Sequence, residues 1–284
     1  MTRKVVIPSE VLHAFSLPKD IRVTPFDKGR SLFSVQHEHR SLLLKRFWRL
    51  ESDRASVLES ILSACAPTGR IPAHHPTRSG KLILEHTDGF FALFDFIHDS
   101  RQVKLSSAAQ AVACIHEAMI TVKAPLTRPP LFVPAPDIHR LLAGTDLEEF
   151  LPIVAEADKA QNHVPTALVH NDLHQDNFIF PVNGKVLLID FESFSHNPII
   201  ADAMFAAFRL SAGIPEGFDT FMEAYAAIRP LDESEKELGL LLLAGDFIRK
   251  LAFILKEKEA GNDAFVADYE KYREFARTTV SWLK

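Results

Sequence analysis

The sequence predicts an α+β protein with two lobes: an N-terminal lobe built on a five-stranded antiparallel sheet with one helix, followed by a mainly helical C-terminal lobe. The chain has 284 residues, more than a single hydrophobic core usually supports. In the first part of the chain, short apolar runs alternate with turn residues, as strands do. From Ser106 onward, apolar residues recur at helical spacing. We therefore expect one domain over residues 1–98 and a second over residues 99–284.

The N-terminal lobe is expected to hold a short helix, the five strands and one longer helix. The stretch around Ser9 is typical of a capped helix start, and Ser52 can cap a second helix that Pro67 ends. Turn residues around Gly29 and Gly89 separate strand-like runs, which predicts hairpins of an antiparallel sheet. The strand-like runs cover residues 21–26, 32–36, 41–47, 81–85 and 90–96.

The C-terminal lobe is expected to be helical apart from one small hairpin over residues 178–189. We expect the two ends of this hairpin to present Asp172 with Asn177, and Asp190 with Glu192, at the same rim. The helical patterns cover residues 108–123, 137–143, 147–162, 200–211, 217–229, 233–260 and 263–284.

Composition excludes several classes of function. The formal net charge of −5 provides no broad cationic field for a phosphate backbone, which argues against a nucleic-acid partner. The two cysteines, Cys65 and Cys114, lie in apolar helical patterns, where small buried thiols are common. This argues against a disulfide scaffold and favours a protein of the reducing cytoplasm. No segment has the length and apolar character of a membrane span or signal peptide. The sequence thus predicts a soluble cytoplasmic protein without a membrane partner, either a monomer or a homodimer.

The segment LVHNDLHQDNFIF, residues 168–180, concentrates polar side chains between two apolar runs. His170 and His174 are four residues apart and could share one helix face as zinc ligands. However, the Asn and Asp residues around them are poor helix formers, and no distant Cys or His cluster completes a tetrahedral set. These features argue against a zinc hydrolase.

The same segment matches phosphoryl transfer more fully. The pattern H-x-D-x-x-x-x-N begins at His170, and after the short hairpin the chain continues as Ile-Asp-Phe-Glu over residues 189–192. In phosphoryl transfer, one Asp accepts the proton of the acceptor hydroxyl, while an Asn and a second Asp hold Mg²⁺ against the triphosphate.

On these residues the chain resembles the aminoglycoside phosphotransferase and choline kinase family, small-molecule kinases with a protein-kinase-like bilobal fold. The resemblance covers nearly the whole chain. It implies that Asp172 is the catalytic base, and that Asn177 and Asp190 bind Mg²⁺. Glu192 would be an accessory group near the metal ions or the substrate, and His170 the structural histidine of the catalytic loop.

Lys45 lies within the apolar strand pattern of residues 41–47, where a buried cation is costly unless it is paired. In the phosphotransferase interpretation, Lys45 binds the α- and β-phosphates and Glu59 of the following helix is its partner. In the alternative, Lys45 faces solvent and Glu59 is an ordinary helix residue. The order of Lys45 before Asp172, Asn177 and Asp190 favours the first interpretation.

Two further segments are candidates for binding ATP. Gly29 and Ser31 fall in a turn that resembles a short nucleotide lid, although a plain hairpin turn has the same sequence features. The run FFALFDFIHD resembles the hinge of the family, which would place backbone groups near Asp95 and Ile97 at the edge of the base. A core strand leaving the sheet is compatible with the same residues.

The resemblance also assigns residues that support the site. Asp202 would brace the catalytic loop through hydrogen bonds, and His116 is interpreted as a packing or hydrogen-bonding residue. Asn171 stands where the family commonly has Gly, and Asn tolerates a positive φ better than most residues do. His174 and Asp176 either contact substrate or phosphate, or orient the loop.

We therefore expect an ATP- and Mg²⁺-dependent phosphotransferase acting on a hydroxyl of a small molecule: an aminoglycoside, choline or ethanolamine, or a homoserine-like acceptor. Asp246 and Arg249 break an apolar helix face and are candidates for contacting the acceptor. The alternative is a nucleotide-binding regulatory module without turnover, which would have no chemical need for Lys45, Asp172, Asn177 and Asp190 together. A protein kinase is disfavoured, since no Ala-Pro-Glu segment and no long activation loop follow Asp190.

Overall fold

The computed structural model describes residues 7–26, 31–48, 50–100, 102–125 and 135–284. The chain divides into two compact units. The first comprises Met1–Gln102, Glu117–Ala124 and Phe178–Glu192, and the second comprises Val103–His116, Pro125–Asn177 and Ser193–Lys284. None of the described helices combines the length and apolar character needed to cross a membrane.

The first unit is built on an antiparallel sheet of six strands. The strand order is β1-β2-β3-β6-β4, and β5 also pairs with β6. The five predicted strands are present, and β4 adds a sixth that is too short to show a sequence pattern. The strands are β1 (Val23–Pro25), β2 (Leu32–His37), β3 (Arg40–Phe47), β4 (His74–His75), β5 (Leu84–His86) and β6 (Gly89–Asp95).

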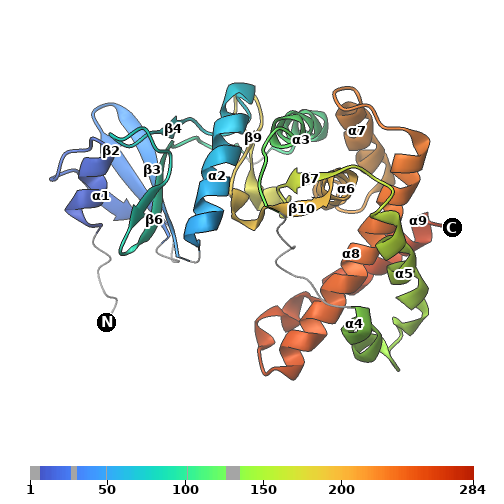
Figure 1. Ribbon diagram of the computed structural model, residues 1–284. Helices are drawn as coiled ribbons and strands as arrows, with labels where there is room; N and C mark the ends of the chain where they lie inside the picture. The colour runs from blue at the N-terminus through green and yellow to red at the C-terminus, as the bar shows by residue number, and fades with distance from the viewer. Residues whose placement is uncertain (1–6, 27–30, 49, 101, 126–134) are drawn as a thin grey trace. The chain divides into compact units, whose positions relative to one another are not determined.

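One face of this sheet packs against α1 (Ser9–Ala14), which lies beside the strands in Figure 1. Val11 and Leu12 of this helix are buried with alternate residues of the central strands, such as Leu42 and Leu44 of β3. Because successive side chains of a strand point to opposite faces, Lys45 lies on the other face of the sheet. The hydrophobic pattern of β3 thus directs the lysine away from the core under α1.

The hairpin of β8 (Phe178–Ile179) and β9 (Leu187–Leu188) belongs to the first unit. Its β9 strand is joined to the segment after α2 (Ser52–Cys65), because the Leu188 N–H donates to the Arg70 carbonyl (2.7 Å). Its β8 strand is followed by Phe180, whose N–H donates to the Asp99 carboxylate (2.9 Å). Two separate parts of the first unit therefore fix the position of the hairpin.

The second unit is mainly helical, as predicted, and its long helix α8 packs against α4, α5, α6 and α9. Gly245 permits the close approach of α8 to α5, because a Cβ there would lie 2.6 Å from the Cβ of Ala157. A short ladder of β7 (Thr166–Val169) and β10 (Ser195–Pro198) precedes α6. The helices are α3 (Leu105–Met119), α4 (Ala135–Leu142), α5 (Leu151–Ala160), α6 (Ile199–Leu210), α7 (Pro215–Ala226), α8 (Glu233–Glu259) and α9 (Tyr269–Trp282).

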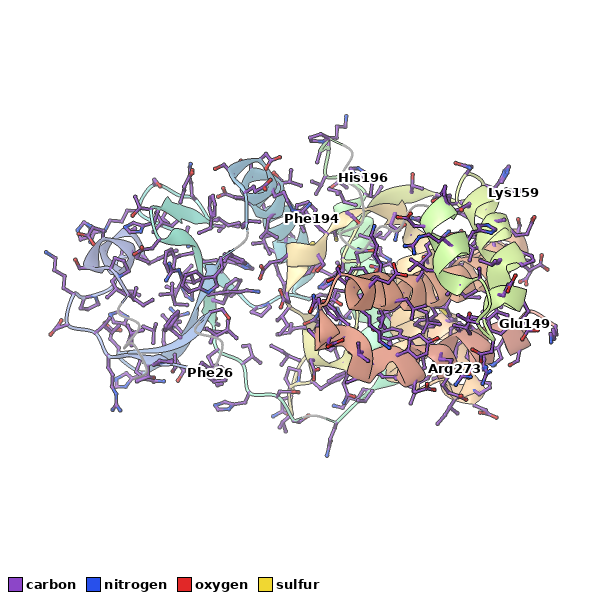
Figure 2. All side chains as sticks on the ribbon, turned by 90° about the horizontal axis from the view of Figure 1, so that it is seen from below. Phe26, Glu149, Lys159, Phe194, His196 and Arg273 are labelled. Atoms are coloured by element: carbon purple, nitrogen blue, oxygen red, sulfur yellow. The ribbon has the colours of Figure 1, made fainter. Side chains whose placement is uncertain are left out.

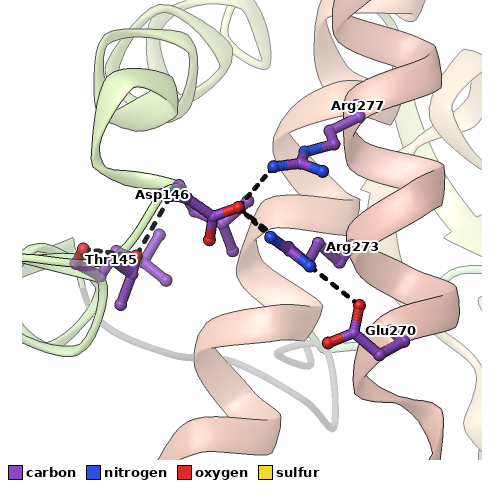
Figure 3. A network of polar contacts seen from close by, with 7 residues as sticks. Thr145, Asp146, Glu270, Arg273 and Arg277 are labelled. Carbon is purple, nitrogen blue, oxygen red and sulfur yellow. Dashed lines mark hydrogen bonds and ion pairs between the residues drawn. The ribbon is translucent and has the colours of Figure 1, made fainter.

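A polar network joins the turn after α4 to α9, as Figure 3 shows. Asp146 accepts hydrogen bonds from Arg273 and from Arg277 (2.5 Å), and Arg273 also donates to Glu270 (3.0 Å). Arg273 lies on the same unit as the exposed Glu149 (Figure 2). These side chains are partly or largely exposed, which limits what each single ion pair contributes to stability.

The buried histidine of β4 makes the stability of the first unit depend on pH. Burial lowers the pKa of His74 from 6.5 to about 4, and its ring packs edge-to-face on Phe94 at 4.4 Å. As the pH falls, His74 therefore binds a proton in the unfolded chain at a higher pH than it does in the folded protein. Protonation of His74 therefore does not reduce the free energy of unfolding above pH 6.5. Between pH 6.5 and pH 4 it lowers this free energy progressively, by up to about 3 kcal/mol.

We expect His74→Phe to flatten this dependence, measured as the free energy of unfolding in urea between pH 7.5 and pH 5. The control is His163→Gln, which alters an exposed histidine of the second unit and should leave the wild-type dependence unchanged. An undiminished loss of stability in His74→Phe would show that another group is responsible.

Candidate functional site

The loop that carries Asp172 is held by a buried carboxylate in the first turn of α6. Asp202 accepts hydrogen bonds from the backbone N–H groups of His170 (3.1 Å) and Asn171 (2.9 Å). His116 donates to the same carboxylate through Nε2 (3.0 Å), and its Nδ1 lies 2.8 Å from the Tyr225 hydroxyl. The predicted bracing role of Asp202 and the hydrogen-bonding role of His116 are confirmed.

The backbone of the loop adopts the conformation expected of its unusual residue. Asn171 has a φ of +65°, in the left-handed region that Asn tolerates. Its side-chain oxygen accepts a hydrogen bond from Asn197 of β10 (3.1 Å). Asn171 therefore adopts a conformation that is readily open to Gly, and its side chain adds a contact that Gly cannot make.

Asp172 and Asn177 form a polar cluster within the second unit. The Asn177 Nδ2 donates to the backbone carbonyl of Asp172 (2.7 Å) and to its carboxylate (3.3 Å). The Asp172 side chain is 44% exposed, whereas Asn177 is buried. Burial raises the pKa of Asp172, but the contact with the His174 side chain and the electrostatic effect of neighbouring groups, including Lys250, outweigh burial and hold this pKa below its ordinary value. Asp172 is thus an accessible, ionised carboxylate with a fixed orientation.

The amide of Asn177 is oriented by these contacts. Because its N–H groups face Asp172, its carbonyl oxygen is left as the atom available to a cation. His174 lies in the same turn, with Nε2 at 3.6 Å from the Asp172 carboxylate. That distance supports a role for His174 in orienting the loop. The Asp176 side chain is 94% exposed.

Lys45, Asp190 and Glu192 form a separate cluster of charges within the first unit. The Lys45 ammonium donates to Asp190 (2.8 Å) and forms an ion pair with Glu192. Burial lowers the pKa of Lys45, but the two carboxylates outweigh this effect and hold it above its ordinary value. One ammonium cannot neutralise two carboxylates, so burial and the adjacent Asp190 raise the pKa of Glu192 although Lys45 opposes them.

The backbone at Asp190 is also unusual. Asp190 directly follows the β9 region and has a φ of +67°, which few residues other than Gly adopt. Such conformations persist where the surrounding structure fixes them, and they occur often at functional sites. The conformation turns the chain after β9, so that residues 190 and 192 both reach Lys45.

The expected pairing of Lys45 with Glu59 is wrong in this structure. Glu59 of α2 instead accepts a hydrogen bond from the backbone N–H of Leu82 (2.6 Å). Its carboxylate is therefore used to hold the segment before β5, and Lys45 obtains its negative partners from the end of the β8–β9 hairpin.

The hinge segment uses some of the groups expected to contact a nucleotide. The Asp95 N–H donates to the Ala73 carbonyl (2.9 Å), and the Asp95 carboxylate accepts from Arg40 (3.2 Å) and His75 (2.8 Å). Among the described residues, none accepts a hydrogen bond from the backbone N–H of Ile97. Of the two predicted hinge residues, Asp95 therefore uses its backbone N–H within the protein, and Ile97 does not within the described residues.

The predicted nucleotide lid is described in part. Ser31 precedes β2, and its carbonyl accepts a hydrogen bond from the Arg46 N–H (2.7 Å). Gly29 lies outside the described residues. Phe26, at the other side of this turn and labelled in Figure 2, is 53% exposed and packs edge-to-face on Phe96 at 5.3 Å.

The sequence pattern indicated Asp246 and Arg249 of α8 as candidates for contacting the phosphate acceptor. In the structure, these two side chains form an ion pair with each other. Arg249 donates to Asp246 (3.0 Å) and to Asp158 of α5 (2.6 Å). Lys250, which sequence reasoning missed, is the residue of α8 that interacts electrostatically with Asp172. Consecutive helix residues point about 100° apart, so only the packing of α8 reveals which one faces the loop.

Known proteins resemble this chain in sequence and in fold. The model of the phosphotransferase enzyme family matches residues 18–238. No protein among curated sequences matches the chain significantly.

Solved structures resemble the whole chain. An aminoglycoside phosphotransferase from Alicyclobacillus acidocaldarius has a TM-score of 0.67 and 13% identity, covering 99% of this chain and 98% of that chain. A choline kinase from Streptococcus pneumoniae has a TM-score of 0.62 and 16% identity, covering 92% and 94%. An amicoumacin kinase, in complex with AMP-PNP and Ca²⁺, has a TM-score of 0.63 and 14% identity, covering 89% of each chain.

At these identities, the solved structures establish a shared fold, the bilobal protein-kinase-like fold expected from the sequence. The family match is independent of them and covers well over half of the 284 residues. The chain therefore belongs to the phosphotransferase enzyme family.

Proposed function

We propose that this phosphotransferase moves the γ-phosphoryl group of ATP to a hydroxyl of a small molecule, with Asp172 as the catalytic base. The observation that carries the proposal is the state of Asp172: an exposed, ionised carboxylate, held by Asn177 on a loop that Asp202 fixes. A general base must be unprotonated, accessible and fixed in orientation, and Asp172 meets all three requirements.

The reaction balances with the residues present. The acceptor oxygen forms a bond to the γ-phosphorus while its proton passes to Asp172. The bond between the γ-phosphorus and the bridging oxygen breaks, and ADP leaves with that electron pair. Asp172 later releases the proton to solvent. The contribution of the protein is therefore mainly orientation of the hydroxyl and stabilisation of charge.

The donor atoms fit a magnesium ion. Asn177 offers a carbonyl oxygen and Asp190 a carboxylate, both of which are hard ligands, with Glu192 as an accessory carboxylate. The described residues contain no cluster of three or more His, Cys, Asp or Glu side chains suited to a metal. Magnesium in kinases commonly takes only one or two protein carboxylates and completes its shell with phosphate oxygens and water. When bound, Mg²⁺ would neutralise the phosphate charge that develops during transfer.

The nucleotide would be bound mainly by residues 1–98, and the acceptor by residues 99–284. Lys45 would bind the α- and β-phosphates, because phosphate oxygens can replace the carboxylates that hold its ammonium. The backbone N–H of Ile97 would donate to the edge of the base, and Gly29 with Ser31 would cover the phosphates. The amicoumacin kinase in complex with AMP-PNP and Ca²⁺ supports nucleotide and divalent-cation binding here by analogy of fold.

Replacement of Asp172 by Asn should stop transfer without preventing nucleotide binding. Loss of the general base is expected to lower kcat by about 10²- to 10⁴-fold. The measurement is ADP release in the presence of Mg²⁺ with a panel of aminoglycosides, amino alcohols, sugars and homoserine. Calorimetric titration with AMP-PNP should give the wild-type affinity.

The matched control for this substitution is Asp219→Asn, which alters an exposed aspartate of α7. It should retain wild-type kcat. Acceptor-dependent turnover that survives in Asp172→Asn would remove Asp172 from the role of base. If the wild type binds AMP-PNP but no panel member stimulates turnover, a regulatory nucleotide-binding module becomes the better description.

Replacement of Lys45 by Ala should weaken nucleotide binding by about 10- to 100-fold, since a charge-assisted contact to phosphate is lost. The readout is the KM for ATP and the Kd for AMP-PNP. Lys81→Ala, an exposed lysine of the same unit, is the control. An unchanged Kd in Lys45→Ala would mean that Lys45 only neutralises Asp190 and Glu192.

A further inference from the structure

Two cations and a tyrosine of the helical unit gather near the catalytic loop, and we call Arg209, Lys250 and Tyr272 the cationic surface. Arg209 is at the end of α6, Lys250 is in the middle of α8, and Tyr272 is on α9. The Lys250 ammonium lies 5.5 Å from the centre of the Tyr272 ring, and the Arg209 guanidinium carbon lies 6.0 Å from it. All three side chains are half-buried, so each is packed and yet open to solvent.

The cationic surface is on the side of α6 that faces Asp172. Arg209 follows Asp202 by seven residues, two turns of the same helix, and therefore lies on the same face. Asp202 holds the backbone just before Asp172. Electrostatics agree: burial lowers the pKa of Lys250, and Asp172 is the strongest of the charges that oppose this effect. Burial likewise raises the pKa of Tyr272, and Asp172 adds to that increase while Arg209 opposes it.

Neither Arg209 nor Lys250 forms an ion pair with a carboxylate among the described residues. In the described part of the chain, no Asp or Glu oxygen lies within 4.0 Å of either charged group. The neighbouring Arg249, in contrast, contacts both Asp158 and Asp246. Asp268 attracts Lys250 from a greater distance and is the one other carboxylate found to do so besides Asp172.

Arg209 is moreover held in place with a hydrogen-bonding group unused. Its Cζ lies 5.4 Å from the ring centre of Phe275 and 5.9 Å from that of Phe205, so aromatic faces flank the guanidinium. Its Nη1 is buried and has no hydrogen-bond partner among the described residues. A buried donor without a protein partner is costly unless water, an ion or a ligand supplies an acceptor, and the carboxylate of a ligand is one such acceptor.

We propose that the phosphate acceptor is an alcohol that also carries a carboxylate, and that Arg209 and Lys250 bind this carboxylate so that the hydroxyl meets Asp172. This inference rests on the proposed function and narrows its substrate class. A cationic acceptor such as choline would instead need carboxylates and aromatic faces. The aromatic faces of this surface are already occupied by Arg209 and Lys250, and these two positive charges would repel a cationic acceptor.

The test compares binding and turnover across matched alcohols. The probes that carry a carboxylate, called anionic probes below, are 4-hydroxybutyrate and glycerate, with homoserine as the zwitterionic member of the set. The cationic or neutral probes are choline, ethanolamine and 1-butanol. Binding is measured by ligand-observed NMR in the presence of Mg²⁺ and AMP-PNP, and turnover by ADP release with ATP. We expect an anionic probe to bind and to be phosphorylated in preference to the others.

The variants separate anion binding from catalysis. Arg209→Gln and Lys250→Gln should each weaken binding of the anionic probe by about tenfold or more, since each removes one charge-assisted hydrogen bond. Lys258→Gln, an exposed lysine of the same helix, should bind the probe as the wild type does. Asp172→Asn should retain probe binding and lose turnover. Thermal unfolding of each variant identifies any loss of folding, and either Gln variant alone suffices for the comparison.

Each other outcome overturns one of the two proposals. Preference for a cationic or neutral alcohol, no binding by any anionic probe, or anion binding that survives both Gln substitutions would overturn the anionic acceptor. Turnover of choline or ethanolamine would at the same time support phosphoryl transfer. Anion binding that depends on Arg209 and Lys250, without ATP consumption, would support the cationic surface and count against the proposed reaction.

Discussion

The contact on which the catalytic loop depends is the one between the Asp202 carboxylate and the backbone N–H groups of His170 and Asn171. A buried carboxylate requires hydrogen-bond donors, and here the loop supplies two and His116 a third. Because Asp202 belongs to the first turn of α6, the rigidity of a helix is passed to a loop that has no regular structure of its own. Asn171 can then keep a positive φ, and Asp172 follows in a defined direction.

Electrostatics divide the carboxylates of the site into two kinds. Asp172 is exposed and is stabilised as an anion by its neighbours, which suits a group that must take up a proton. Asp190 and Glu192 share one ammonium, Lys45, and the surplus negative charge appears as the raised pKa of Glu192. A site with surplus negative charge attracts a divalent cation, and a phosphate can in turn take the ammonium. The charges of this cluster in the first unit are therefore of the kind that the proposed function requires.

The charges of the helical unit differ from those that a cationic phosphate acceptor would require. Proteins of this fold include a choline kinase, whose name indicates a cationic acceptor. In this chain the residue of α8 that interacts with Asp172 is Lys250, and Arg209 lies close to Lys250, while Arg249 is neutralised by Asp158 and Asp246. Under the proposed function, the fold would fix where an acceptor meets Asp172, and the side chains presented by α6, α8 and α9 would decide which acceptor is attracted.

The sequence by itself determined the elements whose residues carry a local pattern. Alternation in β2 and β3, helical spacing beyond residue 106, and the order of Lys45, Asp172, Asn177 and Asp190 are all legible in the chain. The roles of Asp202 and His116 followed from the resemblance to a family. Each of these features depends on neighbours within one element or on a motif of fixed spacing, and such features survive without knowledge of the tertiary structure.

Only the tertiary structure decided which charges meet. Lys45 pairs with Asp190, 145 residues away, while Glu59 is used by the Leu82 N–H. The two-residue strand β4 exists only because β6 offers it a partner. Lys250 and Arg249 are neighbours in sequence, and the packing of α8 alone turns one toward Asp172 and the other toward Asp158. Pairing between residues far apart in sequence depends on which faces of helices and strands pack together. A local sequence pattern does not determine this packing.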